Sequence, residues 1–126
     1  MHELSIAMSL VDIACEELER LGNPRVAALH VRIGPLSGVV GDALTFSFGL
    51  ATDLTPLQGA RLQIETTPIV ARCTDCDGER TIPSVQSLVC PECGRPATDI
   101  IGGREMELVA LELEDDLSEE YVAAHR

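Results

Sequence analysis

The sequence predicts an α+β fold: a small three-stranded mixed sheet with two helices, into which a four-cysteine module of the zinc-ribbon type is inserted. The first supporting observation is the order helix, strand, helix, strand within residues 1–71. A strand–helix–strand unit implies a parallel strand pair with a right-handed crossover. The second is a pair of Cys-x-x-Cys motifs after these elements. The third is a last strand at 105–113, which we expect to pair antiparallel with the second strand, because the cysteine module loops out between them.

The first helix is predicted over residues 3–21, where apolar residues recur at the i, i+3, i+4, i+7 spacing of one helix face. Cys15 lies on this face and is expected to be a buried small hydrophobic residue. Gly22-Asn23-Pro24 is a stop signal that ends the helix. A second helix is predicted at about 42–52, with Asp42 as its N-cap. The apolar face of the first helix consists of Leu4, Ala7, Met8, Val11, Ala14, Cys15 and Leu18.

Residues 26–33 and 61–72 are predicted as the first two strands from their alternating side-chain pattern. Pro68 lies inside the second of them and predicts an edge position or a bulge, because proline has no N–H group for the ladder. His30 lies in the first strand, where we expect a structural imidazole whose hydrogen bonds are satisfied. Gly102-Gly103 predicts a hinge-like link between the cysteine module and the last strand.

This order of elements divides the chain into three parts. Residues 1–71 and 104–114 form an α/β body, and residues 72–103 form a zinc-binding module with two connections to that body. Residues 115–126 form an acidic C-terminal tail. We expect the tail to be a solvated segment or a short helix, in preference to a docking or cation-binding element.

The composition excludes several classes of partner. Twenty-one acidic and nine basic residues give this chain of 126 residues a formal net charge of −12 at pH 7. Such a charge disfavours nucleic acid and anionic membrane surfaces. No apolar run approaches the ~20 residues of a membrane-spanning helix, and no basic and apolar secretory segment begins the chain. We therefore expect a cytoplasmic protein whose thiols stay reduced.

Four cysteines are the strongest chemical signal in the chain. Cys73 and Cys76 form one Cys-x-x-Cys pair, Cys90 and Cys93 form the other, and thirteen residues separate the two pairs. Structural zinc takes four tetrahedral ligands, and two residues between the cysteines of a pair let both sulfurs reach one ion. Two disulfides or two redox-active pairs are the alternatives, which a reducing compartment and the doubled motif disfavour. The pattern predicts a closed structural zinc site, which has no open position for a reactive water.

The chain start offers a second set of metal ligands. Met1, His2 and Glu3 precede the first helix, and the first backbone N–H groups of a helix have no intrahelical acceptor. The α-amine, the His2 imidazole and one or two of these amides together form the nitrogen set that square-planar Ni(II) or Cu(II) prefers. A histidine at position 2 without any metal role is the simpler interpretation of these residues alone. His125 is expected to be a solvated tail residue.

Taken together, these features resemble the hydrogenase maturation nickel chaperones of the HypA/HybF family. The resemblance rests on Met1-His2-Glu3-Leu4-Ser5, on the two cysteine pairs, and on the stretch from Val31 to Gly38. It covers about residues 1–114, and the joint pattern is far more specific than the cysteine motif alone. The tail beyond Asp115 is extra to the family pattern.

The resemblance implies that the chain binds two metals with different roles. His2, with the Met1 amine and the backbone amides of His2 and Glu3, would hold transferable Ni(II), which makes residues 1–71 and 104–114 a nickel-binding body. Cys73, Cys76, Cys90 and Cys93 would hold structural Zn(II). The implied task is nickel delivery to the large subunit of a [NiFe]-hydrogenase, with a maturation GTPase of the same pathway as partner; some relatives also serve urease.

Alternatives to this function remain at the sequence level. A zinc-ribbon protein-interaction module without metal delivery explains the cysteines equally well. An enzyme is disfavoured, because no cluster of His, Asp or Glu accompanies a nucleophile and the predicted zinc site is closed. The chain is expected to be a monomer or a homodimer.

Overall fold

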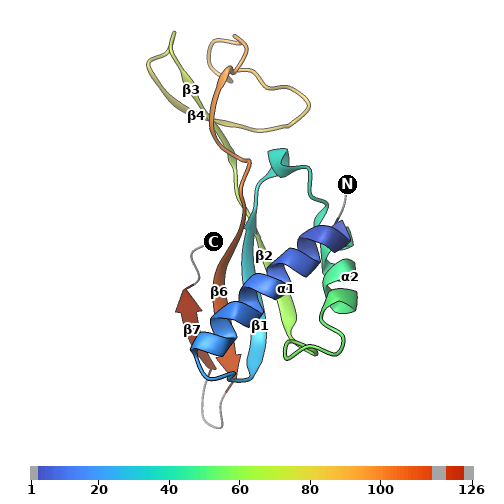
Figure 1. The fold of residues 1–126 in the computed structure, drawn as a ribbon. Helices are drawn as coiled ribbons and strands as arrows, with labels where there is room; N and C mark the ends of the chain where they lie inside the picture. Colours follow the sequence, from blue (N-terminus) through green and yellow to red (C-terminus); the bar gives the residue numbers. More distant parts are fainter. Residues whose placement is uncertain (1–2, 115–118, 124–126) are drawn as a thin grey trace. The chain divides into compact units, whose positions relative to one another are not determined.

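The computed structural model describes residues 3–114 and 119–123 and divides them into two units (Figure 1). The first unit comprises residues up to 32, residues 39–65 and residues from 107 onward, and the second comprises residues 33–38 and 66–106. The first unit contains helices α1 (Glu3–Arg20) and α2 (Gly41–Ala51) with strands β1 (Val26–Ile33), β2 (Arg61–Thr66), β6 (Met106–Glu114) and β7 (Glu119–Ala123). The second contains the 3-10 helix η1 (Pro35–Ser37) with strands β3 (Ile69–Cys73), β4 (Gly78–Ile82) and β5 (Asp99–Gly102).

The predicted fold class is confirmed, because the structure has two helices, a small mixed sheet and a cluster of four cysteines. The strand order in the main sheet is β2-β1-β6-β7. The prediction that the last strand pairs with the second is wrong, because β6 pairs with β1. β1 is buried along almost its whole length, and so apolar a strand is stable in the centre of a sheet, with neighbours on both sides.

The expectation of a solvated or helical tail is wrong for residues 119–123, which form β7. This strand pairs antiparallel with β6 in the register Ala110↔Ala123 to Glu114↔Glu119. Tyr121 and Val122 are residue types that favour strands, and the free edge of β6 supplies the backbone partners that the charge pattern could not reveal. Residues 115–118 and 124–126, the rest of the predicted tail, lie outside the described residues.

Helix α1 has the predicted extent but buries a rotated face. Ala7, Val11, Ala14 and Leu18 are buried as predicted, whereas Leu4 and Met8 are 46% and 54% exposed. Leu10 completes the buried stripe, so Cys15 lies at its margin and is only half-buried. The helix ends as predicted, with Gly22 and Asn23 at the left-handed φ values of 85° and 56°.

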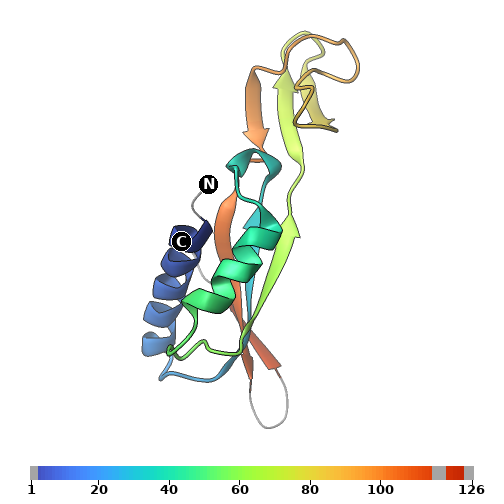
Figure 2. The ribbon, with the colours of Figure 1, turned by 90° about the vertical axis from the view of Figure 1, so that its right-hand side faces the viewer.

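Helix α2 begins one residue before the prediction and is not capped by Asp42. Its N-cap is Val40, whose side chain makes no cap hydrogen bond, and Asp42 lies in the first turn. The Val40 N–H instead donates to the Glu3 Oε2 atom at 3.3 Å. Since a carboxylate is favoured at a helix N-terminus, Glu3 of α1 acts as the cap of α2. The two helices lie beside one another against the sheet (Figures 1 and 2).

The core of the first unit is built mainly from aliphatic side chains of α1, β1, α2 and β6. Leu18 of α1, Leu29 and Val31 of β1, and Leu44 of α2 are among its fully buried members. Leu57, Leu108 and Leu111 join them. Buried apolar area is the dominant favourable term in folding, so this aliphatic core compensates for the scarcity of aromatic residues.

The second unit is an antiparallel three-stranded sheet with the order β4-β3-β5 (Figure 2). Its small core consists of Ile69, Ala71 and Ile82, against which Leu36, Leu88, Ala97 and Ile100 pack. The single strand predicted over 61–72 is wrong, because β2 and β3 belong to different sheets. Pro68 lies between them, and its missing N–H group interrupts the ladder where the chain changes sheet.

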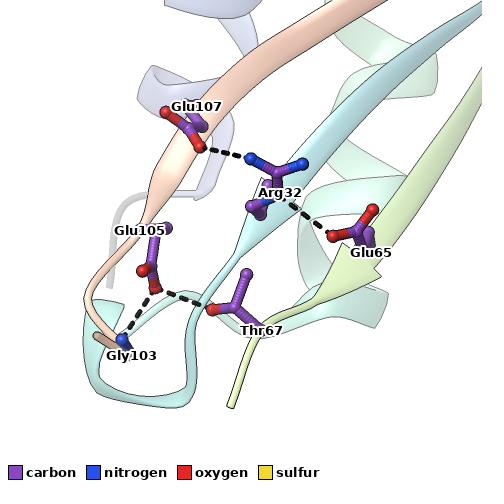
Figure 3. Close-up of polar contacts among 6 residues, drawn as sticks. All are labelled: Arg32, Glu65, Thr67, Gly103, Glu105 and Glu107. Atoms are coloured by element: carbon purple, nitrogen blue, oxygen red, sulfur yellow. Dashed lines mark hydrogen bonds and ion pairs between the residues drawn. The ribbon is translucent and has the colours of Figure 1, made fainter. Parts of the chain in front are cut away.

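In the second unit, the backbone at Gly34 passes close to the backbone at Gly103, one of the two glycines that predicted a hinge. Gly34 N–H donates to the Glu105 carbonyl at 2.8 Å, and Leu36 N–H donates to the Gly103 carbonyl at 2.7 Å. The Glu105 Oε1 atom accepts from Gly103 N–H at 2.8 Å and from the Thr67 hydroxyl at 2.7 Å (Figure 3). A Cβ atom at position 34 would come within 2.2 Å of the Gly103 oxygen, so glycine here permits close backbone contact.

Candidate metal centres

The four cysteines come from two turns of the second unit. Cys73 is the last residue of β3 and Cys76 lies in the turn to β4, which Asp77 closes at a φ of 51°. Cys90 and Cys93 lie in the loop between β4 and β5. There Cys90 N–H donates to the Arg95 carbonyl, and Gly94 N–H donates to the Cys90 carbonyl, both at 2.8 Å. Gly94 has a φ of 75°, which a residue with a side chain rarely adopts.

The sulfur geometry fits a tetrahedral metal site. All four Sγ atoms lie within 4.8 Å of one another. Cys73 and Cys93 sulfurs are 3.6 Å apart, and Cys76 and Cys90 sulfurs are 3.9 Å apart. Four ligands at roughly 2.3 Å from a central zinc ion would be about 3.8 Å from one another. The thiols are free rather than joined as disulfides, so the cluster has the donor set and the spacing of a closed zinc site.

Backbone amides favour the thiolate form of one cysteine of the cluster, Cys90. The Cys93 and Glu92 amides donate to the Cys90 sulfur and lower the pKa of that thiol to about 7. Hydrogen bonding to Cys73 and Cys93 raises the pKa of Cys76 to about 12. Sulfurs this close to one another can all be deprotonated together only when a cation binds between them. Zinc is such a cation, because it coordinates thiolates and releases their protons on binding.

Two ion pairs connect the two cysteine turns, and each runs from an acidic residue of one turn to an arginine near the other. Glu92, inside the second Cys-x-x-Cys, pairs with Arg80 of β4 at 2.9 Å. Asp75, inside the first, pairs with Arg95 at 3.1 Å. Each acidic residue thus contacts an arginine that follows the other cysteine pair. Neither pair was predicted from the sequence. A signal was present, because each motif has an acidic residue just before its second cysteine and an arginine shortly after it.

The predicted nickel ligands lie at the start of the first unit. Met1 and His2 are outside the described residues. Glu3 is the first residue of α1, and its carboxylate is engaged at the N-terminus of α2. Sequence analysis predicted only a backbone role for Glu3 and did not foresee this contact, which depends on the packing of the two helices.

His30 has the structural role that was predicted for it. Its Nε2 atom lies 2.9 Å from the Glu112 Oε1 atom, and Glu112 is only 3% exposed. Arg61 also approaches Glu112, at 3.5 Å. A carboxylate this deeply buried requires such partners. His125 lies outside the described residues. Among the helices that the structure describes, none combines the length and apolar character needed to cross a membrane.

Fold and cysteine cluster together define a small metal-binding protein, in which an α+β unit is joined to a separate unit carrying a four-thiolate site. Comparison with known proteins makes this class specific. The family model described as "Hydrogenase/urease nickel incorporation, metallochaperone, hypA" matches residues 1–113. The chain therefore belongs to the HypA family of nickel metallochaperones, which act in hydrogenase maturation.

Individual relatives agree with this family. The hydrogenase maturation factor HypA of Chloroflexus aurantiacus is 52% identical over 112 residues, which cover 89% of this chain and 98% of that protein. The factor of the same name from Roseiflexus sp. is 50% identical over 94% of this chain and 97% of its own length. The solution structure of the Ni metallochaperone HypA from Helicobacter pylori is similar with a TM-score of 0.61 and 26% identity, over 90% of this chain and 97% of that one.

Proposed function

We propose that this chain carries Ni(II) at its N-terminus for [NiFe]-hydrogenase maturation and keeps a structural Zn(II) ion on Cys73, Cys76, Cys90 and Cys93. The observation that carries the division between the metals is the clustering of the four sulfurs. Four thiolates fill a tetrahedral zinc ion completely, so that site has no position for a transferable metal or a substrate. The cargo needs a separate site, and the protein acts as a carrier rather than as an enzyme.

The nickel ligands in this proposal are nitrogen atoms at the chain start. They are the Met1 amine, the His2 imidazole and the backbone amides of His2 and Glu3. The Glu3 carboxylate is already used by the Val40 N–H group, which supports a backbone rather than a side-chain contribution from Glu3. The Glu3 amide begins helix α1 and lacks an acceptor within the helix, so coordination costs no helical hydrogen bond. Ni(II) favours planar nitrogen sets of this kind.

Hydrogenase maturation implies interaction with other maturation factors. We assign the partner roles to a maturation GTPase of the pathway and to the large subunit of a [NiFe]-hydrogenase, which receives the nickel ion. The net charge of −12 favours basic surfaces on both partners. The cytoplasm is the compartment of this exchange, since the cysteines must stay reduced to bind zinc.

The deciding experiment is a nickel and zinc titration of untagged protein that begins at Met1, compared with His2→Ala. We expect His2→Ala to lose specific nickel binding while it keeps one zinc ion and a native amide-exchange pattern. His125→Ala is the matched control and should bind nickel like the wild type.

Two results would contradict the proposal. Equal nickel affinity in wild type and His2→Ala would remove the N-terminal site. A wild type that binds zinc but no nickel would favour the alternative, a zinc-ribbon interaction module without metal delivery. Loss of zinc in His2→Ala would show that the two sites are not separable.

A further inference from the structure

Arg80 is placed beside the cysteine cluster by the β3–β4 ladder. It pairs with Ala71 across the sheet, and its side chain is 25% exposed. Its Nη2 atom contacts Glu92 at 2.9 Å, and its Nη1 atom donates to the Glu79 carbonyl at 2.9 Å. Together with Cys73 and Cys90, Arg80 lines a recess of about 10 Å³, which leaves no room for a ligand larger than a water molecule.

One donor of this guanidinium is unused. The Nε atom of Arg80 is buried and has no hydrogen-bond partner within residues 3–114. Buried N–H groups are almost always paired, so an orphaned donor requires an explanation. Cys73 and Cys90 line the same recess as Arg80, which places two residues of the cysteine cluster beside this arginine.

The zinc site needs a cation nearby. Four thiolates and one Zn(II) ion carry a net charge of −2, and the Cys90 side of the cluster is buried. Arg95 is the other arginine of the reciprocal pairs, but it is 69% exposed and its Nε atom is already bound to Asp75. Arg80 therefore combines a buried, unpaired Nε donor with neighbouring cysteines, which Arg95 does not.

We propose that Arg80 compensates the negative charge of the four-thiolate zinc site through its free Nε–H group and thereby slows the release of zinc. This role rests on the zinc assignment made above. Glu92 and the Glu79 carbonyl act as fixed anchors for the guanidinium, so the residue is a positioning and charge-balancing group rather than a metal ligand. Groups around metal ligands commonly change metal affinity by about 10–100-fold when they are removed.

Gly78 supplies the space that this arrangement needs. A Cβ atom at position 78 would lie 2.8 Å from the Arg80 Nη1 atom. Gly78 is not among the residues with positive φ, so alanine suits the backbone there and the flexible end of Arg80 must move. Gly78→Ala is thus expected to displace the guanidinium while its charge is retained.

The test is the rate at which zinc-loaded, full-length protein transfers zinc to a chromophoric chelator. We expect release from Arg80→Gln to be about tenfold or more faster than from wild type, with Gly78→Ala similarly fast and Arg80→Lys intermediate. Arg95→Gln is the matched control, because it removes an exposed ion pair, and should stay within about threefold of wild type. Release from Arg80→Gln at the rate of Arg95→Gln would overturn the proposal.

A second measurement separates charge compensation from a merely structural role. In cobalt-substituted protein, loss or displacement of the positive charge beside the sulfurs makes the thiolates stronger donors. The sulfur-to-Co(II) charge-transfer band of Arg80→Gln and Gly78→Ala should then move to lower energy, and zinc-bound thiolates should react faster with iodoacetamide. Bands and rates equal to wild type in both variants would overturn the role of Arg80. A wild type without a four-thiolate cobalt spectrum would overturn the zinc assignment itself.

Discussion

Single residues of the second unit fix where its backbone segments meet. Gly34 and Gly103 allow two segments to approach closely enough for the Leu36 N–H to reach the Gly103 carbonyl. Glu105 then uses one oxygen atom for both the Gly103 N–H and the Thr67 hydroxyl. A larger residue does not fit at position 34, because the two atoms nearest to an added Cβ belong to the backbone of Gly103.

Gly34→Ala tests this crossing. Its Cβ would meet the Gly103 carbonyl, which cannot move away without breaking hydrogen bonds, so we expect a loss of about 3 kcal/mol or more in the free energy of unfolding. Urea unfolding of the zinc-loaded protein measures the loss. Gly49→Ala is the control, because no atom lies within 4 Å of its added Cβ. In helix α2 that change should stabilise by about 0.5–1 kcal/mol. Equal midpoints for the two variants would contradict the expectation.

At the scale of elements, strand β7 completes the main sheet. It covers the side of β6 that faces away from β1 over the register Ala110↔Ala123 to Glu114↔Glu119. An uncovered strand edge presents unpaired N–H and carbonyl groups, which other chains can bind. The segment that follows β6 therefore contributes to the sheet, although four of its first six residues are acidic.

Deletion of residues 115–126 should expose this edge. We expect a lower urea midpoint and a greater tendency to associate, while zinc content and nickel affinity stay unchanged, because the proposed metal ligands lie elsewhere in the chain. Sedimentation velocity and urea unfolding measure the two effects. A shorter deletion of residues 124–126 keeps β7 and serves as the control. If the longer deletion behaves like the shorter one, β7 does not stabilise the sheet.

At the scale of the whole molecule, the four-cysteine cluster and the proposed nickel ligands fall in different structural units. The cysteine cluster lies in the second unit, whereas the proposed nickel ligands begin the first. Each site can therefore have its own stability. The zinc ion contributes folding energy to its unit, while a nickel ion at the chain start can be released without unfolding the α/β core.

Nickel release should depend on pH in this arrangement. The amine, with a reference pKa near ~8, and the imidazole, near ~6.5, must lose protons to bind nickel, and each coordinated amide releases one more. As the pH falls, protons compete more strongly with nickel for these nitrogen atoms, so nickel affinity should drop about tenfold or more between pH 7.5 and 6. Isothermal titration at both values measures this change, with zinc content as the internal control. An unchanged nickel affinity would contradict pH-driven release.

Local sequence signals determined the two helices, the first strand, the end of α1 and the cysteine cluster. Gly22-Asn23-Pro24 ends α1 through backbone preferences that need no tertiary partner. The two Cys-x-x-Cys turns bring four sulfurs together because their spacing suits one ion. The family resemblance followed from the same local features and agrees with the family model over residues 1–113.

Only the tertiary structure decided which strands pair, where α2 begins and which charged residues surround the cysteines. β6 lies beside β1 because the most apolar strand belongs in the middle of the sheet. The Glu3 carboxylate at α2 and Arg80 beside the cysteines depend on contacts between residues far apart in sequence. Local preferences act within a few residues, whereas burial and charge pairing depend on the packed chain. The sequence alone therefore determined the helices, the first strand and the four clustered cysteines, and the fold decided the pairing of the strands and the neighbours of each site.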